Sequence, residues 1–181
     1  RPISSAASDV YKRQFHMSEQ AIKKILITGA NGFIGGSLMR YYQNHGQDTV
    51  GVDLIGNDDD IAEGDISQPD TISQQLQECD VIIHTAALVS NAMQDSDMWQ
   101  VNVLATRNLI QAAKEHKVRR FVQISSIVAY GNSAEGELDE THPVHADGGS
   151  YVLTKLASEH VVLSEQANDD IEVVIIRPGD A

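Results

Sequence analysis

The sequence has few residues suited to a disulfide, a metal or a polyanionic partner. Cys79 is the single cysteine among 181 residues, so it cannot form an internal disulfide, and we interpret it as a small residue at a helix end. Lysine and arginine number 13 against 26 aspartates and glutamates, and the formal net charge of −13 argues against nucleic acid or an anionic membrane as partner. Of the seven histidines, His142 and His145 have no carboxylate or cysteine at helical ligand spacing, so we expect no metal site.

Long hydrophobic stretches are also missing. No run reaches the length of about 18 apolar residues that a membrane span needs, and no charged-then-apolar signal segment precedes Met17. We therefore expect a cytoplasmic protein that takes a small-molecule substrate.

The two ends of the chain need separate treatment. Residues 4–14, SSAASDVYKRQ, resemble the in-frame translation of a sequencing-library adapter, so we expect residues 1–16 to be a non-native, disordered leader. A natural disordered arm is the alternative. Residues 17–181 are then one domain, and the stop just after a predicted strand suggests that a longer protein continues beyond Ala181.

The most informative stretch is the glycine-rich turn Thr28–Gly35, TGANGFIG, between an apolar run and a helical pattern. Such a turn lets the backbone approach a pyrophosphate, and the helix that follows directs its free N–H groups and positive dipole end at the phosphates. A tight connection without ligand is the alternative. Asp53 ends the next apolar run, where a carboxylate can bind a ribose diol, and residues 54–56 offer no Arg or Lys for a 2′-phosphate. We therefore expect NAD, with NADP less favoured.

Apolar runs alternate with amphipathic segments along the chain. This pattern predicts an α/β fold with a doubly wound parallel sheet of Rossmann type, order 3-2-1-4-5-6, with helices on both faces. The predicted strands are Lys24–Thr28, Thr49–Asp53, Ile61–Glu63, Asp80–His84, Arg120–Ser125 and Glu172–Arg177. The predicted helices are Ile34–His45, Pro69–Glu78, Asp97–His116 and Ser150–Glu165.

A second chemical pattern is Tyr151-x-x-x-Lys155. Residues four apart share a helix face, and an adjacent ammonium favours the phenolate of Tyr151, which makes the phenol a candidate general acid or base. A solvated helix face is the alternative. Ser126 follows a predicted strand at the ligand-bearing edge of the sheet, where its hydroxyl could hold the substrate oxygen.

Together these motifs resemble the extended short-chain dehydrogenases/reductases, the NAD-dependent epimerase/dehydratase family. The resemblance runs from Ile22 to Gly179 and also includes Gly64-Asp65-Ile66, His84–Ala87, Asn102-Val103 with Thr106, and Ser125-Ser126 ahead of Tyr130-Gly131. It implies that a C-terminal substrate-binding part, which family members have after the Arg177-Pro178-Gly179 turn, is absent here. It also implies a homodimer through helices 97–116 and 150–165.

The resemblance implies a role for each site residue. Gly29, Gly32 and Gly35 would line the pyrophosphate together with Asn31, Phe33 and Ile34; Asp53 would hold the adenosine ribose; Asp65 and Ile66 would flank the adenine. Thr85, Ala86 and Ala87 would contact the nicotinamide half, with Asn102 and Pro178 close by. Ser126 would orient substrate, Tyr151 would act as acid/base, and Lys155 would bind the nicotinamide ribose. Asp65 as a simple cap and Asn102 as a solvated helix residue are the alternatives.

Three functions remain open at this point. The first is an NAD-dependent oxidoreductase that transfers hydride between nicotinamide and a secondary alcohol or ketone. The second is a nucleotide-sugar epimerase that uses bound NAD transiently, and the third is a non-catalytic dinucleotide-binding sensor or scaffold. Ile127-Val128 replaces the Asp-Glu pair of the family's sugar-nucleotide dehydratases, which disfavours dehydration and loosely resembles its steroid dehydrogenases and flavonol reductases. We expect the 181-residue chain itself to bind cofactor weakly and to be inactive.

Overall fold

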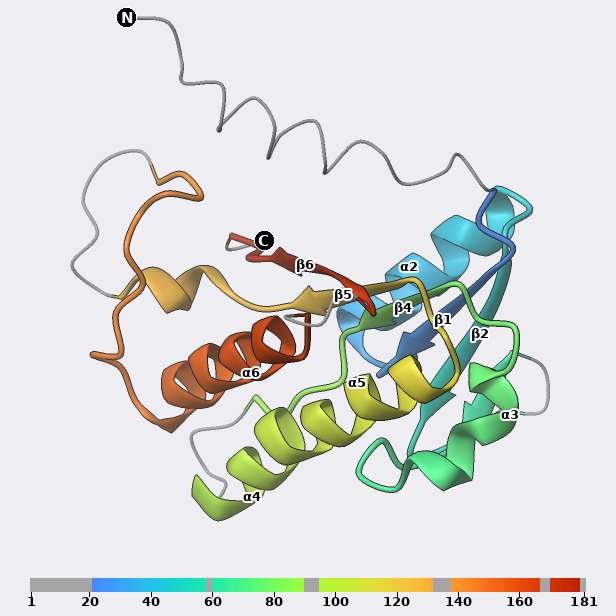
Figure 1. Ribbon diagram of the computed structural model, residues 1–181, viewed down its shortest axis with the longest axis horizontal. Coiled ribbons are helices and arrows are strands. Elements are labelled where there is room, and N and C mark those ends of the chain that lie inside the picture. The colour runs from blue at the N-terminus through green and yellow to red at the C-terminus, as the bar shows by residue number, and fades with distance from the viewer. Residues whose placement is uncertain (1–20, 58–59, 90–94, 132–137, 167–169, 180–181) are drawn as a thin grey trace, which may run out of the picture.

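A parallel sheet forms the centre of the protein. The computed structural model describes residues 21–57, 60–89, 95–131, 138–166 and 170–179, and the predicted leader at residues 1–16 lies outside them. In this part of the chain six parallel strands follow the order β3-β2-β1-β4-β5-β6, which confirms the predicted topology (Figure 1). They are β1 (Lys24–Thr28), β2 (Asp48–Asp53), β3 (Ile61–Glu63), β4 (Val81–His84), β5 (Arg120–Ile124) and β6 (Glu172–Ile176).

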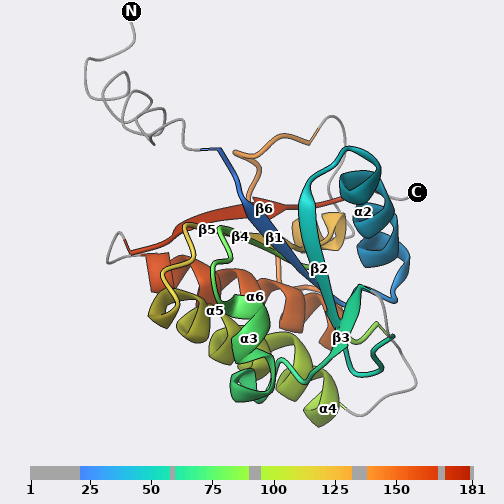
Figure 2. The same cartoon turned by 90° about the vertical axis from the view of Figure 1, so that its right-hand side faces the viewer.

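Helices cover both faces of this sheet (Figure 2). Helix α2 (Phe33–Asn44) lies on one face, where Met39 packs against Ile25 and Ile27. The other face carries α3, α5 and α6, and its core includes Leu26 and Phe121. The bounds on that face are η1 (Pro69–Ile72), α3 (Ser73–Leu76), α4 (Asp95–Trp99), η2 (Gln100–Ala105), α5 (Thr106–Glu115) and α6 (Ser150–Gln166). Because successive strand side chains point to opposite faces, the apolar runs bury residues in both layers.

The helix predictions need three corrections. The predicted helix 69–78 is a 3-10 turn followed by one α turn that ends at Leu76, and Glu78 lies at φ +59°, outside helical geometry. The predicted helix 97–116 begins at Asp95 and contains the π-helical segment η2, whose widened turns hydrophobic periodicity does not reveal. A 3-10 turn, η3 (Ile127–Tyr130), was not predicted; its N-cap is Ser126.

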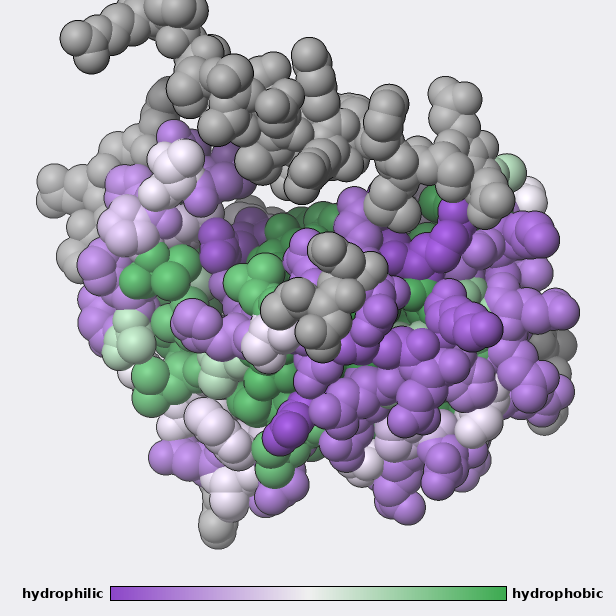
Figure 3. Space-filling view, in the orientation of Figure 1, coloured by the Kyte–Doolittle hydropathy of each residue, from purple (hydrophilic) through white to green (hydrophobic). Residues whose placement is uncertain are grey.

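Several apolar side chains stay outside the core. Trp99 at the end of α4, Leu104 in η2, and Leu153 and Leu163 on α6 are 37–49% exposed. Hydrophobic residues gather over the region of α6 on the face turned to the viewer in Figure 3. Among the described residues no helix has the length and hydropathy to cross a membrane, and no group of three or more candidate ligands could hold a metal.

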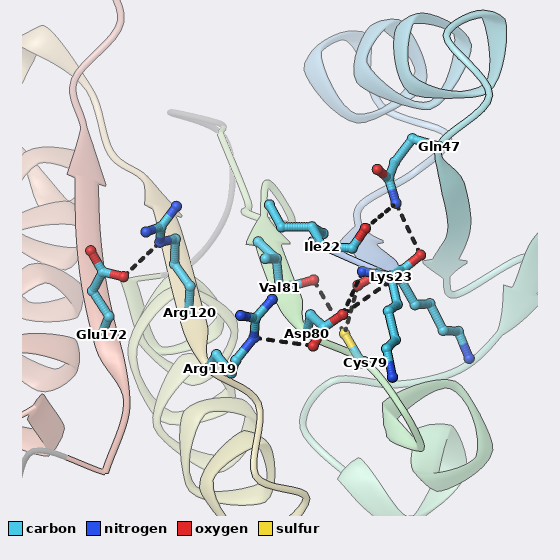
Figure 4. Close-up of polar contacts among 10 residues, drawn as sticks. Ile22, Lys23, Gln47, Cys79, Asp80, Val81, Arg119, Arg120 and Glu172 are labelled. Carbon is cyan, nitrogen blue, oxygen red and sulfur yellow. Dashed lines mark hydrogen bonds and ion pairs between the residues drawn. The ribbon is translucent and has the colours of Figure 1, made fainter. Parts of the chain in front are cut away.

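The amino ends of the strands are joined by the carboxylate of Asp80 (Figure 4). It accepts hydrogen bonds from the backbone N–H of Lys23 at 2.6 Å and Lys24 at 3.4 Å, and from Nε of Arg119 at 3.1 Å. Burial opposes ionisation of Asp80, but these donors outweigh it and keep its pKa below the ordinary value. Burial also raises the pKa of the neighbouring Cys79 thiol to about 11, so the thiol stays protonated at neutral pH. This edge is structural and lies opposite the strand ends that form the pocket.

Candidate functional site

The glycine turn connects β1 to α2 with very little space for side chains. Gly29 has φ +68°, and a Cβ there would come within 2.8 Å of the Ala86 backbone. A Cβ on Gly35 would lie 2.1 Å from the carbonyl oxygen of Gly29. Gly32 is the N-cap of α2, and no side chain caps the helix. No side chain therefore competes with an anion for the first amides of α2.

Asp53 ties the glycine turn to the end of β2. One carboxylate oxygen accepts from the N–H of Asn31 at 2.9 Å, and the other accepts from the N–H of Leu54 at 2.8 Å. The Asn31 side chain in turn donates to the carbonyl of Ile55 at 2.7 Å. Each carboxylate oxygen can accept further hydrogen bonds, so Asp53 can orient the turn and still bind a diol.

A pocket of about 770 Å³ opens where this turn meets the carboxyl ends of the strands. It is lined by most of the predicted cofactor residues: Gly29, Asn31, Gly32, Phe33, Ile34, Gly35, Asp53, Asp65, Ile66, Thr85, Ala86 and Ala87. Among the described residues that line it there is no lysine or arginine. Asn102, Lys155 and Pro178, which were predicted with this group, do not line it.

Further lining residues were missed from the sequence. Most of them are sequence neighbours of predicted lining residues: Val52, Leu54, Gly64, Ser67, Leu88 and Val89. They would have been found if each whole segment, and not only its motif residues, had been assigned to the site. Three others belong to η2: Gln100, Val101 and Ala105. No signal in the sequence identifies them, because their position depends on which side of that segment faces the sheet. Asp65 lines the pocket and also accepts from the N–H of Ser67 at 2.8 Å, so the capping alternative describes a real contact.

Asn102 is buried, which rules out the solvated-helix alternative. Its side chain accepts from the N–H of Leu88 at 2.8 Å and donates to the carbonyl of Leu88 at 3.0 Å and to the hydroxyl of Thr154 at 3.1 Å. Thr154 itself donates to the carbonyl of Tyr151 at 2.9 Å. Asn102 thus joins the pocket loop after β4 to α6 without facing the pocket itself.

His84 lies fully buried behind the pocket, between two hydroxyls. Thr106 donates to the carbonyl of Asn102, so it must accept from Nε2–H of His84, 2.9 Å away. Nδ1 of His84 then accepts from the hydroxyl of Thr28 at 2.7 Å. Burial, with the charge of Lys155, lowers the pKa of His84 to about 3. The imidazole is therefore neutral at all physiological pH values.

Ser126, Tyr151 and Lys155 meet at the end of β5. The phenol of Tyr151 is half-buried, and burial raises its pKa above the ordinary value although a hydrogen bond with the Ser126 side chain lowers it. Lys155 is 4% exposed and donates from Nζ to the carbonyl of Ile124 at 2.6 Å. Burial lowers the pKa of Lys155 to about 8, against the opposing charge of Glu159.

This geometry corrects one expectation. The sequence predicted that Lys155 brings the pKa of Tyr151 down, whereas the pKa of Tyr151 is raised. The physical reason is that the ammonium binds a backbone carbonyl of β5 while the phenol loses hydration. Pro178 lies beside the same group, since its carbonyl accepts from the N–H of Ile127 at 3.0 Å.

Comparison with known proteins identifies a family that shares this sequence pattern and fold. A model of the NAD dependent epimerase/dehydratase family matches residues 25–181. Sterol demethylase protein B of Methylococcus capsulatus is 33% identical over an alignment of 169 residues, and the match covers 85% of this chain and 50% of that protein. The chain spans about half the length of the curated relatives it matches.

Solved structures give the same result. A short-chain dehydrogenase/reductase superfamily protein from Agrobacterium tumefaciens with bound NAD is 31% identical, with a TM-score of 0.77 over 85% of this chain and 48% of that one. The UDP-glucuronic acid 4-epimerase of Bacillus cereus in complex with NAD is 30% identical, with a TM-score of 0.76 over 86% of this chain and 55% of that one.

Proposed function

The chain belongs to the NAD-dependent epimerase/dehydratase family, and we propose that it is the cofactor-binding part of an oxidoreductase that moves hydride between NAD and a secondary alcohol or ketone. The observation that carries this proposal is the meeting of the uncapped α2 N-terminus, Asp53 and Asp65 around one pocket at the carboxyl edge of the sheet. The Ser126, Tyr151 and Lys155 group adds acid/base chemistry at the end of β5.

The residues present fit a dinucleotide. The turn backbone occupies the space that a Cβ of Gly35 would need. Phe33, Ile34 and Gly35, whose amides begin α2, line the pocket, and a pyrophosphate would bind at these amides. Asp53 would bind the adenosine ribose through its remaining acceptor sites, and Asp65 with Ile66 would flank the adenine. Two carboxylates and no cation among the described lining residues disfavour a 2′-phosphate, so NAD is proposed over NADP.

Bound NAD would supply the hydride donor or acceptor. Tyr151 exchanges the hydroxyl proton of the substrate, and Ser126 holds the substrate oxygen. Because the pKa of Tyr151 is raised, the phenol rests protonated at neutral pH and can donate to a ketone oxygen. Lys155, on the same face of α6, would bind the nicotinamide ribose of the cofactor.

A nucleotide-sugar epimerase is the second candidate. The likeness to the UDP-glucuronic acid 4-epimerase, at 30% identity, favours it over a non-catalytic module. Such an enzyme returns the hydride to its substrate, so protein extended to the length of its relatives would hold NAD tightly and yield no net NADH. A dehydrogenase that is supplied with its alcohol substrate would instead release NADH.

Calorimetry on the 181-residue chain tests the cofactor assignment. We expect NAD to bind at least about tenfold more tightly than NADP, a difference of about 1.4 kcal/mol. Asp53→Ala should remove most of the NAD affinity, whereas Asp70→Ala, on η1 and outside the pocket lining, should leave it unchanged. Equal affinities for the two cofactors would contradict the assignment of Asp53.

Turnover tests the acid/base assignment. In protein extended to the length of its relatives, Tyr151→Phe should reduce kcat at least about 100-fold, the usual contribution of a positioned acid/base group, while leaving NAD affinity nearly intact. A Tyr151→Phe variant with normal turnover would remove Tyr151 from the reaction.

We also propose that the protein forms a homodimer through helices 97–116 and 150–165, which correspond to the end of α4 with η2 and α5, and to α6. These segments carry exposed apolar side chains that sheet packing does not use: Trp99, Leu104, Leu153 and Leu163. Burying such residues against a second copy would remove that surface from water.

A further inference from the structure

Three consecutive residues at the end of β5 each contact a different turn of α6. The carbonyl of Ile124 accepts from Lys155, and the hydroxyl of Ser125 donates to the carboxylate of Glu159. Ser126 hydrogen-bonds with Tyr151, the first member of this helical row. The contacted residues of α6 are spaced four apart, so Glu159 extends the Tyr-x-x-x-Lys row by one turn.

Glu159 is held from a third element as well. Its carboxylate accepts two hydrogen bonds from Arg177, Nε to Oε1 at 3.0 Å and Nη2 to Oε2 at 2.7 Å. Arg177 follows β6 and also donates from Nη1 to the hydroxyl of Tyr130 at 3.0 Å, with its guanidinium 4.9 Å from that ring's centre. A two-pronged Arg–carboxylate pair fixes the orientation of the acid as well as its charge.

We propose that Glu159 is a positioning residue for the reaction centre: its buried carboxylate, fixed by Arg177 and Ser125, keeps Lys155 charged and directed at the end of β5. The relevance of that charge to catalysis rests on the proposed function, in which Lys155 binds the nicotinamide ribose. Geometry brings the two groups together independently of that function, since Lys155 and Glu159 lie one turn apart on α6 and bind the adjacent residues Ile124 and Ser125.

Charge balance explains why the fold needs such a residue. A lysine that is 4% exposed loses hydration, which favours the neutral amine, and an adjacent carboxylate opposes this loss. Glu159 is itself only 4% exposed, and Arg177 supplies the positive charge that its burial requires. The titratable groups that face this cluster come from α6, β4, η3 and the end of β6: Tyr151, Glu159, His84, Tyr130 and Arg177.

The experiment is a measurement of the Lys155 side-chain pKa by NMR in the 181-residue chain, with the signal assigned through Lys155→Arg. Wild type should titrate near 8, and Glu159→Gln should lower the pKa by about 1 unit because the opposing charge is gone. Glu159→Asp keeps the charge and should restore most of the shift. Glu165→Gln is the matched control on α6, since Glu165 pairs with Lys114 at 3.2 Å, and it should leave Lys155 unchanged.

A purely structural Glu159 gives a different result. In that case Glu159→Gln would lower stability but leave the Lys155 pKa within about 0.3 units of wild type, a small fraction of the shift that a neighbouring charge produces. That result would overturn the proposal. If the single variant does not fold, Arg177→Gln is compared with the Glu159→Gln and Arg177→Gln double variant. The double variant should have the lower Lys155 pKa, because only the carboxylate differs between the two proteins.

NAD titrations of the same variants separate this inference from the proposed function. In wild type, NAD affinity should weaken as the pH rises through about 8, and in Glu159→Gln the midpoint should move down by the shift measured for Lys155. Absence of NAD binding in wild type would count against the proposed function, while the Lys155 pKa would still decide the role of Glu159.

Discussion

Replacing Gly35 with alanine tests whether the glycine turn is built around close backbone contact. The new Cβ would lie 2.1 Å from the carbonyl oxygen of Gly29, about 1.3 Å inside the 3.4 Å at which ordinary contact begins. It would also lie 2.8 Å from the carbonyl carbon of Gly29 and 2.9 Å from Oγ1 of Thr85. Because backbone atoms cannot rotate away as a flexible side chain can, the turn itself has to move.

The size of the effect follows from two opposing terms. Forcing a methyl into such a space costs about 3 kcal/mol, the upper part of the usual range for overpacking, because the clash is with backbone. Alanine gains about 1 kcal/mol over glycine inside a helix. The net expectation for Gly35→Ala is a loss of about 2 kcal/mol in the free energy of unfolding, or about 1 M in the urea midpoint.

Gly36→Ala is the matched control in the next position of α2. Its Cβ would meet the carbonyl oxygen of Ala30 at 3.2 Å and the end of the Arg40 side chain at 3.5 Å, contacts that need only a small adjustment. We expect its stability to stay within about 1 kcal/mol of wild type, since the helix-propensity gain offsets the adjustment. Calorimetry should also show NAD affinity reduced at least about tenfold in Gly35→Ala, where the amides shift, and nearly unchanged in Gly36→Ala. Equal stability and equal affinity in the two variants would refute the reasoning.

Three further changes should have measurable effects. The pKa of His84 is about 3 when folded and 6.5 ordinarily, so the unfolded chain binds the extra proton and stability should fall as the pH drops from 6.5 toward 3; urea unfolding of His84→Gln should show a shallower pH dependence. The pKa of Asp80 is lowered in the fold, so Asp80→Asn should cost about 1–2 kcal/mol at pH 7, and the difference from wild type should close as the pH falls below 3.8; an unchanged unfolding midpoint at pH 7 would contradict this. Leu163→Glu should weaken the proposed dimer in sedimentation experiments, whereas Tyr41→Glu, on the opposite face of the sheet, should not.

Short sequence motifs and apolar periodicity predicted the strand order and most of the residues that line the pocket. The strand order followed from alternating apolar and amphipathic segments, because parallel strands with right-handed crossovers admit few arrangements. The glycine turn and Asp53 could be located because each motif is short and is followed or preceded directly by its strand. The same local view missed η2 and η3, since π and 3-10 turns leave no hydrophobic period of their own.

The group of Ser126, Tyr151 and Lys155 was harder to predict, because its contacts join segments that are distant in the sequence. Lys155 was expected to act on Tyr151 from sequence spacing, yet its ammonium binds Ile124, 31 residues earlier in the chain. Asn102 was placed near the cofactor, yet its amide joins Leu88 to Thr154. Spacing shows which residues share a helix face, but burial and competing partners decide what each polar atom binds.

The sequence by itself determined the parallel α/β sheet, the glycine-rich turn and the acidic residue beside it, because each depends on a few adjacent residues and on strand periodicity. Only the tertiary structure decided the charge state of the buried groups. His84 is neutral between two hydroxyls, and Lys155 keeps a proton beside Glu159, whose own charge is balanced by Arg177 from the end of β6. These states follow from lost hydration and from partners 18 to 56 residues away along the chain, which folding alone brings together.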